Sequence, residues 1–275
     1  MKMKSIQLVI LSLSLGLLGC LPEKVVEIEI PPHERQLVVE CYLEPGKPFR
    51  LMLTESVGFF DAPDTPFVDG ALVVVSHGGI HDTLSNVPAF DFQDLKFYNY
   101  SSSSIVPADY DSDFTLFVRD RLGRELRGTT KLLRPIEFSD LFHTFNEDTM
   151  AAVTAQWLDE PGVKNYYRFT LHKDSLVVSE ESKKGLRIEF TLDDRIGDGQ
   201  EFTVSTFFDF KPGASLICTV YRLTEEAWRY FETASLSADA NGNPFANPVT
   251  IYSTVEGGFG VFTGLNYFRD TLEIP

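Results

Sequence analysis

Cys20 is the residue whose neighbours most clearly specify a chemical reaction. Two lysines precede an apolar run over residues 8–18, and this run ends in Leu17-Leu18-Gly19-Cys20. A basic region, a short apolar region and small residues before a cleavage point make up a secretory signal. The Leu-Gly pair before the cysteine resembles a bacterial lipobox, in which signal peptidase cuts before the cysteine and its sulfur receives diacylglycerol. We therefore predict a lipoprotein signal peptide over residues 1–19 and lipid attachment at Cys20.

Two alternatives to the lipoprotein signal are a membrane-spanning anchor and a plain secretory signal with a coincidental cysteine. The apolar run is shorter than the roughly 20 residues that a spanning helix needs, and no second run of that length follows. Residues 20–35 contain Pro22, Pro31 and Pro32 and are predicted to be the lipidated cysteine and its tether. The predicted location is the outer membrane, on the cell surface or on the periplasmic face.

Two histidines and an aspartate have spacing that allows metal binding. His77 and His81 flank Gly78-Gly79, and Asp82 follows. Because they surround a hairpin-type turn and do not share a helix face, a solvated hairpin tip is the preferred interpretation. A serine hydrolase would need Gly-x-Ser-x-Gly between a strand and a helix, and the sequence lacks that motif. We predict no catalytic residue, no metal site and no cofactor.

Two groups of aspartates share part of the spacing of a calcium loop: Asp109, Asp111, Asp113 and Asp120 in the first, and Asp193, Asp194 and Asp198 in the second. The first group has Phe114 where the loop needs glycine for its sharp turn. The second has Ile196 where a ligand is needed. Both groups are interpreted as acidic turns, with calcium binding as the alternative.

Composition excludes some partners. The net charge is −16, and the chain after residue 19 has 22 basic against 40 acidic side chains. Such a chain is repelled by nucleic acid and by anionic lipid, so we predict no nucleic-acid partner. Beyond Cys20 only Cys41 and Cys218 remain, both in strand-like runs. Two buried free thiols are the preferred interpretation, and a single disulfide is the alternative.

Short apolar runs separated by turn residues predict a mostly β protein. Strands are expected at 37–43, 49–54, 71–75, 114–118, 152–157, 166–171, 186–191, 201–207 and 215–221, with loops at 101–104 and 240–248. Thr224 is a good N-cap for one helix near residues 225–234. The predicted organisation is an immunoglobulin-like or prealbumin-like β-sandwich over residues 36–134, followed by a second β-rich domain over residues 135–275 that carries this helix.

Several motifs, in order along the chain, resemble one protein family. They are Leu37-Val38-Val39-Glu40, Leu53-Thr54-Glu55-Ser56, Val68-Asp69-Gly70-Ala71, Asp159-Glu160-Pro161-Gly162 with Asn165-Tyr166-Tyr167-Arg168, Asn243-Pro244-Phe245 and Gly257-Gly258-Phe259-Gly260. The sequence is identified as similar to the outer-membrane lipoproteins of Bacteroidota catalogued as domain of unknown function 4249. Cys41 departs from the glycine usual there. The resemblance supplies no catalytic residues.

The resemblance implies a lipoprotein often encoded beside TonB-dependent outer-membrane receptors. The first functional hypothesis is therefore a non-catalytic binding or accessory lipoprotein that works with such a transporter and contacts the membrane through its lipid anchor. The sequence specifies no small-molecule ligand. The alternatives are a hydrolase of exported polymers, whose carboxylates would converge only in the fold, and a purely structural envelope protein.

Overall fold

β-strands are the main secondary structure of the computed structural model, which describes residues 34–58, 65–91, 96–147, 149–173, 187–241, 243 and 245–275. The N-terminal strands are β1 (Leu37–Leu43), β2 (Pro48–Glu55), β3 (Leu72–His77), β4 (Ile80–Leu84), β5 (Ala89–Asp91), β6 (Lys96–Tyr98), β7 (Tyr100–Ile105), β8 (Asp113–Arg119) and β9 (Glu125–Lys131). Then follow β10 (Asp140–Phe145), β11 (Ala151–Leu158), β12 (Tyr166–Lys173), β13 (Arg187–Asp193), the 3-10 helix η3 (Asp194–Ile196), β14 (Glu201–Ser205), β15 (Ser215–Leu223), α2 (Glu225–Ala240), β16 (Val255–Glu256), β17 (Phe259–Gly264) and β18 (Tyr267–Glu273). Cys20 and the predicted signal peptide lie outside the described residues.

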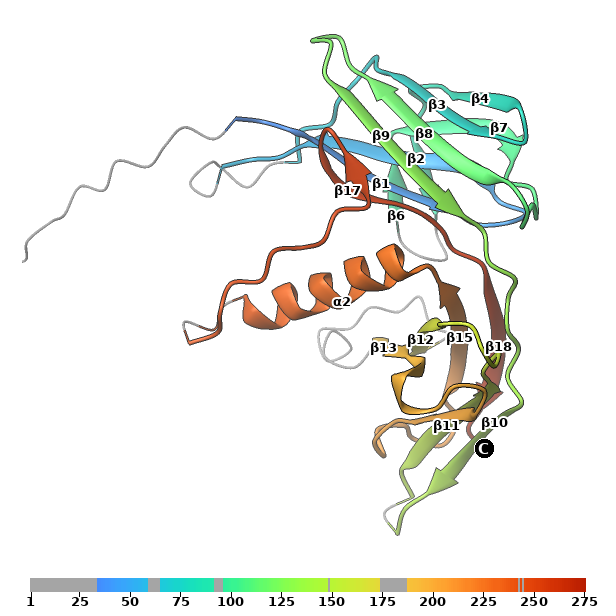
Figure 1. Ribbon diagram of the computed structural model, residues 1–275. Helices are drawn as coiled ribbons and strands as arrows, with labels where there is room; N and C mark the ends of the chain where they lie inside the picture. The colour runs from blue at the N-terminus through green and yellow to red at the C-terminus, as the bar shows by residue number, and fades with distance from the viewer. Residues whose placement is uncertain are drawn as a thin grey trace, which may run out of the picture. The chain divides into compact units, whose positions relative to one another are not determined.

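The N-terminal strands form a β-sandwich (Figure 1). One sheet has the order β17-β1-β2-β7 and the other β16-β9-β8-β3-β4, and β5 pairs with β6 in a separate ribbon. Successive side chains of a strand point to opposite faces, so alternate residues such as Phe114, Leu116 and Val118 of β8 enter the core. Gly78 and Gly79 have positive φ angles and close the β3–β4 hairpin, as predicted.

A second sandwich is built from strands after residue 139. Its sheets have the orders β10-β11-β14 and β13-β12-β15-β18. Trp157 is fully buried in the core between them, with ring centroids 5.7 Å from Tyr167 and 5.8 Å from Phe202. The mostly β class with a single α-helix, predicted from the sequence, is confirmed for the described residues.

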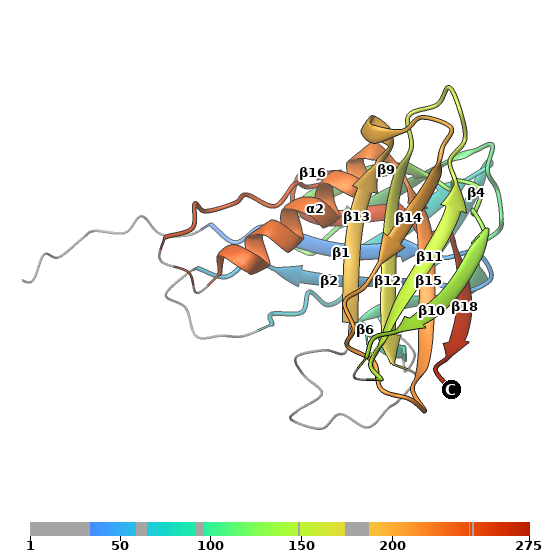
Figure 2. The same cartoon turned by 90° about the horizontal axis from the view of Figure 1, so that it is seen from below.

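The central strands β12 and β15 of the sheet β13-β12-β15-β18 are buried on both faces. Tyr167 and Phe169 enter the sandwich core, while Tyr166 and Tyr221 face α2 and pack with Phe231. This explains why β12 is buried over six consecutive residues where a strand at a solvated sheet would alternate. Figure 2 shows α2 alongside β13 and β12, which it contacts.

The helix begins where the sequence predicts it. The Thr224 hydroxyl accepts a hydrogen bond from the N–H of Ala227 at 3.3 Å, so Thr224 is the N-cap. The helix ends at Ala240, six residues later than predicted. Beyond Phe231 it has no buried residue, so local helix propensity sustains the final turns and packing contributes little.

The chain returns to the first sandwich near its C-terminus. β17 pairs in parallel with β1, and β16 pairs with β9 (Figure 1). A Cβ atom on Gly260 would lie 1.9 Å from the Val39 carbonyl oxygen, and φ of Gly260 is +115°, so only glycine fits here. The domain boundary at 134/135 stays a prediction, and β16 and β17 belong to the sheets of the first sandwich although they follow residue 135.

One predicted loop is a strand in the structure, and several other strands were not predicted. Residues 101–104, predicted as a loop, are part of β7, which pairs with β2. The serine side chains of this segment show no apolar alternation, so the sequence did not indicate a strand. Backbone hydrogen bonds to β2 form it instead. Strands β5, β6, β9, β10, β16, β17 and β18 were not predicted either. Among the described helices, none has both the length and the apolarity to cross a bilayer.

Candidate functional site at the loops of the second sandwich

A buried carboxylate lies where the Asp159-Glu160-Pro161-Gly162 motif leaves β11. Asp159 is 1% exposed and accepts hydrogen bonds from the Tyr167 hydroxyl and, at 2.8 Å, from the N–H of Gly199. Burial raises the pKa of Tyr167, and the Asp159 carboxylate raises it further. The tyrosine therefore keeps its proton and remains the donor.

Asn165 joins the same motif to a second loop. Its side-chain amide donates to the carbonyls of Glu160 (2.9 Å) and Val163 (2.8 Å), and its oxygen accepts from Arg222 at 2.6 Å. Its backbone N–H donates to the Asp194 carboxylate at 2.6 Å. Arg222 also binds the Glu160 carboxylate at 2.5 Å. These hydrogen bonds satisfy the buried amide of Asn165. Together they fix the loop that precedes β12.

Three aspartates meet between these loops. The carboxylates of Asp159, Asp194 and Asp198 each offer an oxygen, and these atoms lie within 4.8 Å of one another. Among the described residues this is the one group of three or more His, Cys, Asp or Glu with such geometry. Carboxylate oxygens are the donors that calcium prefers, but calcium takes six to eight of them. Asp198 is exposed, and one of its oxygens accepts the N–H of Gly162 at 2.8 Å.

The sequence interpretation found only part of this cluster. It grouped Asp193 with Asp194 and Asp198, whereas in the structure Asp193 pairs with Arg195 at 2.6 Å and Asp159 takes the third place. Asp159 is remote in sequence and meets the others because β11 pairs with β14. The signal that could have found it is its place in the acidic-Pro-Gly motif. The interpretation of residues 193–198 as an acidic turn agrees with η3 and the turn that follows it.

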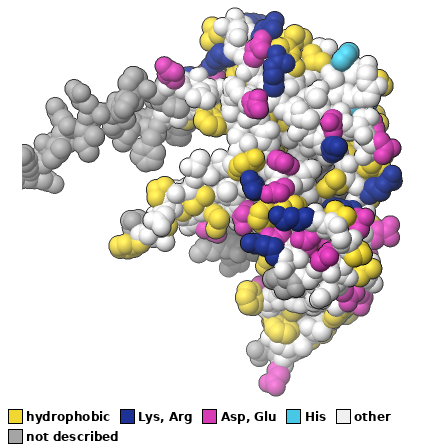
Figure 3. All heavy atoms as spheres, in the orientation of Figure 1, with side chains coloured by type: hydrophobic (Ala, Val, Ile, Leu, Met, Phe, Trp, Pro, Cys, Tyr) yellow, Lys and Arg dark blue, Asp and Glu magenta, His cyan; other side chains and the backbone are white. Residues whose placement is uncertain are grey.

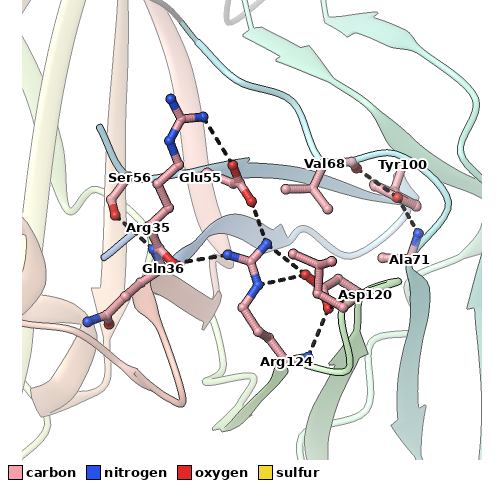
Figure 4. Close-up of polar contacts among 10 residues, drawn as sticks. Arg35, Gln36, Glu55, Ser56, Val68, Ala71, Tyr100, Asp120 and Arg124 are labelled. Carbon is pink, nitrogen blue, oxygen red and sulfur yellow. Dashed lines mark hydrogen bonds and ion pairs between the residues drawn. The ribbon is translucent and has the colours of Figure 1, made fainter. Parts of the chain in front are cut away.

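A second polar network lies at the start of the first sandwich and centres on Arg124 (Figure 4). Its guanidinium contacts the Glu55 carboxylate, Asp120 at 2.7 Å and the Arg35 carbonyl oxygen at 3.0 Å. The hydrogen bond from Arg124 lowers the pKa of Glu55. All these charges are paired with one another, so the arrangement ties β2 to the β8–β9 turn and offers no reactive group.

Other motif residues near this network also make backbone connections (Figure 4). The Ser56 hydroxyl accepts from the N–H of Gln36 at 3.0 Å. The Tyr100 hydroxyl donates to the Val68 carbonyl and accepts from the N–H of Ala71, both at 2.9 Å. The motifs of the first sandwich therefore hold the segment before β3 against β7. Sequence reasoning missed Tyr100 and Arg124, because neither lies in a recognisable motif.

The candidate metal-binding histidines do not come together. Cross-strand partners share a sheet face, and the register Ser76↔His81 places His81 on the face opposite His77. His77 is buried between the rings of Phe49 and Phe114, and the sequence prediction of a solvated tip was wrong for it. Its imidazole lies 3.4 Å from the carboxylate of Asp82. His81 instead contacts the Ser76 hydroxyl at 2.7 Å.

The first aspartate group forms a turn and a strand end. Asp109 accepts the backbone N–H groups of Asp111 and Ser112 at 3.0 and 3.1 Å. Asp113 begins β8 and pairs with Lys131 at 3.3 Å. Asp120 follows the other end of β8, about 20 Å away at strand geometry. The predicted acidic turn therefore describes residues 109–112, whereas Asp113 and Asp120 lie at the two ends of β8.

The two remaining cysteines are separate. Cys41 lies in the core of the first sandwich and Cys218 in that of the second, and both are free. Burial raises the pKa of each thiol to about 12. Both are therefore inert near neutral pH.

Fold and site together define a mostly β protein of two sandwiches with one α-helix, whose sequence motifs form polar contacts between its loops. The chain belongs to the family described as Domain of unknown function (DUF4249), whose model matches residues 23–271. No curated protein matches it.

Two solved structures show a distant likeness. A cytokine receptor complex (crystal form 1A) is 11% identical with a TM-score of 0.26, over 86% of this chain and 96% of that one. The FN1–FN3 domains of chicken CNTN1 are 10% identical with a TM-score of 0.24, over 67% and 57%. No argument about function follows from likenesses at these TM-scores.

Proposed function

We propose that this chain is a non-catalytic lipoprotein of a Bacteroidota cell envelope, anchored in the outer membrane at Cys20. In this proposal it serves as a binding or accessory component of a TonB-dependent transporter. The observation that carries the proposal is the Leu17-Leu18-Gly19-Cys20 motif after a basic and apolar leader. Diacylation with a further acyl chain on one cysteine gives stable anchoring, whereas a single chain gives only marginal binding.

The chemistry of the described residues supports a binding role over catalysis. A hydrolase needs carboxylates that reach a substrate, and general acids must lie within hydrogen-bond reach of the reacting atom. Asp159 and Asp194 are buried and committed to loop hydrogen bonds. Only Asp198 of the cluster is open to solvent. The structural envelope protein remains the alternative that predicts no bound partner.

Two measurements test the proposal. Cys20→Ser, expressed in the native host, should move the protein out of the membrane fraction and abolish incorporation of an alkyne-labelled fatty acid. Detergent extracts of the wild type should contain a TonB-dependent receptor that co-purifies with the lipoprotein. Unchanged membrane attachment in Cys20→Ser would overturn the anchor. A wild-type preparation without any transporter would favour the structural alternative.

A further inference from the structure

The end of α2 and the segment that follows it carry exposed apolar side chains. We call residues 233–241, 243 and 245–254 the α2 tip. Phe245 is 95% exposed, and Leu236 and Ile251 are 49% and 46% exposed. Figure 3 shows hydrophobic side chains at the end of this helix and the loop after it. Scattered exposed apolar residues are ordinary, but an almost fully exposed phenylalanine in a segment nearly free of charged side chains has the composition of a contact site.

Hydrogen bonds connect parts of the α2 tip to one another. The N–H of Tyr252 donates to the Thr233 hydroxyl at 2.9 Å, which ties the returning chain to the helix. Asn243 accepts from the N–H of Phe245 at its side chain and from the N–H of Ala246 at its carbonyl, both at 3.1 Å. This turn presents the phenylalanine outward. A preformed anchor loses little conformational entropy on binding.

The charge of the α2 tip identifies the chemistry of its partner. Residues 233–254 contain one charged side chain, Asp239, in a chain that is 23% charged. Depletion of charge with aromatic residues present is the composition of an interface core. The last helical turn has no basic residue, so Asp239 and the negative end of the helix dipole lie together. Such an end repels an anionic membrane and attracts a positively charged protein surface.

We propose that the α2 tip is a docking element that inserts Phe245, with Leu236 and Ile251 exposed in the same segment, into an apolar pocket on a partner protein. Lysine or arginine side chains at the rim of that pocket face Asp239 and the helix end. The proposal rests on the proposed function, because an accessory lipoprotein requires a surface that contacts its transporter. It adds the location of that surface and the chemistry of the site that receives it.

The first test compares two exposed phenylalanines in the full-length lipoprotein from the native host. Phe245→Asp should reduce the amount of co-purified transporter about tenfold or more, as expected for a central anchor. Phe207→Asp is the matched control, since Phe207 is 82% exposed in the second sandwich, and it should retain the transporter. Equal retention by Phe245→Asp and the wild type would overturn the docking element while leaving the proposed function in place.

Asp239→Lys separates binding from folding. A lysine in the last turn suits the helix dipole, so the melting temperature should stay the same or rise, while retention of the transporter should fall. Retention of the transporter at the wild-type level would overturn the proposal that basic side chains of the partner face Asp239.

A benzoylphenylalanine at position 245 tests the contact independently of co-purification. Its photo-crosslink should map to an apolar pocket bordered by lysine or arginine on the transporter. A crosslink to such a pocket on another envelope protein would support the docking element and contradict the transporter as partner. A crosslink to lipid, to a second copy or to no protein would overturn the docking element.

Discussion

Replacement of Asp159 by alanine removes the acceptor on which the loop network depends. The Tyr167 hydroxyl and the Gly199 N–H both donate to this carboxylate inside the protein. A buried donor left without a partner costs about 1–3 kcal/mol, and two donors are affected. We therefore expect the free energy of unfolding to fall by about 2–5 kcal/mol. A loss this large would be a substantial share of the stability of an ordinary domain.

The replacement by asparagine provides the matched control. Its carboxamide oxygen can still accept from Gly199, and its NH2 group can donate to the hydroxyl oxygen of Tyr167, so only the hydroxyl hydrogen loses its acceptor. Asp159→Asn should therefore cost about 1–2 kcal/mol, less than the alanine replacement. Asp198→Ala, at an exposed carboxylate with one backbone bond, should cost about 1 kcal/mol or less.

Urea unfolding of a soluble form without residues 1–20 measures these differences. The fluorescence of Trp157 and Trp228, which lie against Tyr167 and Tyr166 of β12, reports the second sandwich and its helix. The midpoint should shift while the slope with urea stays constant, since the same surface is exposed on unfolding. An Asp159→Ala protein as stable as Asp198→Ala would refute the reasoning, because the buried bonds would then contribute no more than an exposed one.

Four further outcomes are expected. Millimolar calcium should leave the melting temperature unchanged, because hydrogen bonds already occupy the clustered carboxylates; a rise that chelator reverses would contradict this. Gly260→Ala should cost about 3 kcal/mol or more by forcing β17 from β1, whereas Gly46→Ala, with nothing within 4 Å, should cost only about 1 kcal/mol of backbone strain; comparable urea midpoints would disprove the overlap. Burial raises the pKa of six tyrosines, Tyr167 among them, so the native state holds protons that the unfolded state releases. Stability should be full below about pH 10 and fall above it, as urea midpoints across alkaline pH would measure. Cys41 and Cys218 should not react with a thiol reagent at pH 8 in the native protein, and both should react in denaturant. Fast labelling of the native protein would contradict their burial.

Local patterns predicted those parts of the fold that depend on local interactions. Alternating apolar residues predicted β8, Gly78-Gly79 predicted the hairpin, and Thr224 predicted the start of α2. Each signal acts within a few residues, through strand alternation, positive φ or a capping hydroxyl. β7 escaped prediction, because its serines reveal their pairing with β2 only when that strand is present.

The candidate site depended on long-range pairing. Sequence spacing allowed a shared metal site for His77 and His81 as the less favoured alternative, and the β3–β4 register placed them on opposite faces. Asp159 and Asp194 are far apart in the sequence, and strand pairing brings them together. Side-chain chemistry and local conformation depend on short stretches of sequence, so the sequence itself determined the mostly β class, and the leader at Cys20 stays its prediction. Strand register and the return of the chain to its first sheets decide which polar groups meet. These contacts were decided by the tertiary structure alone.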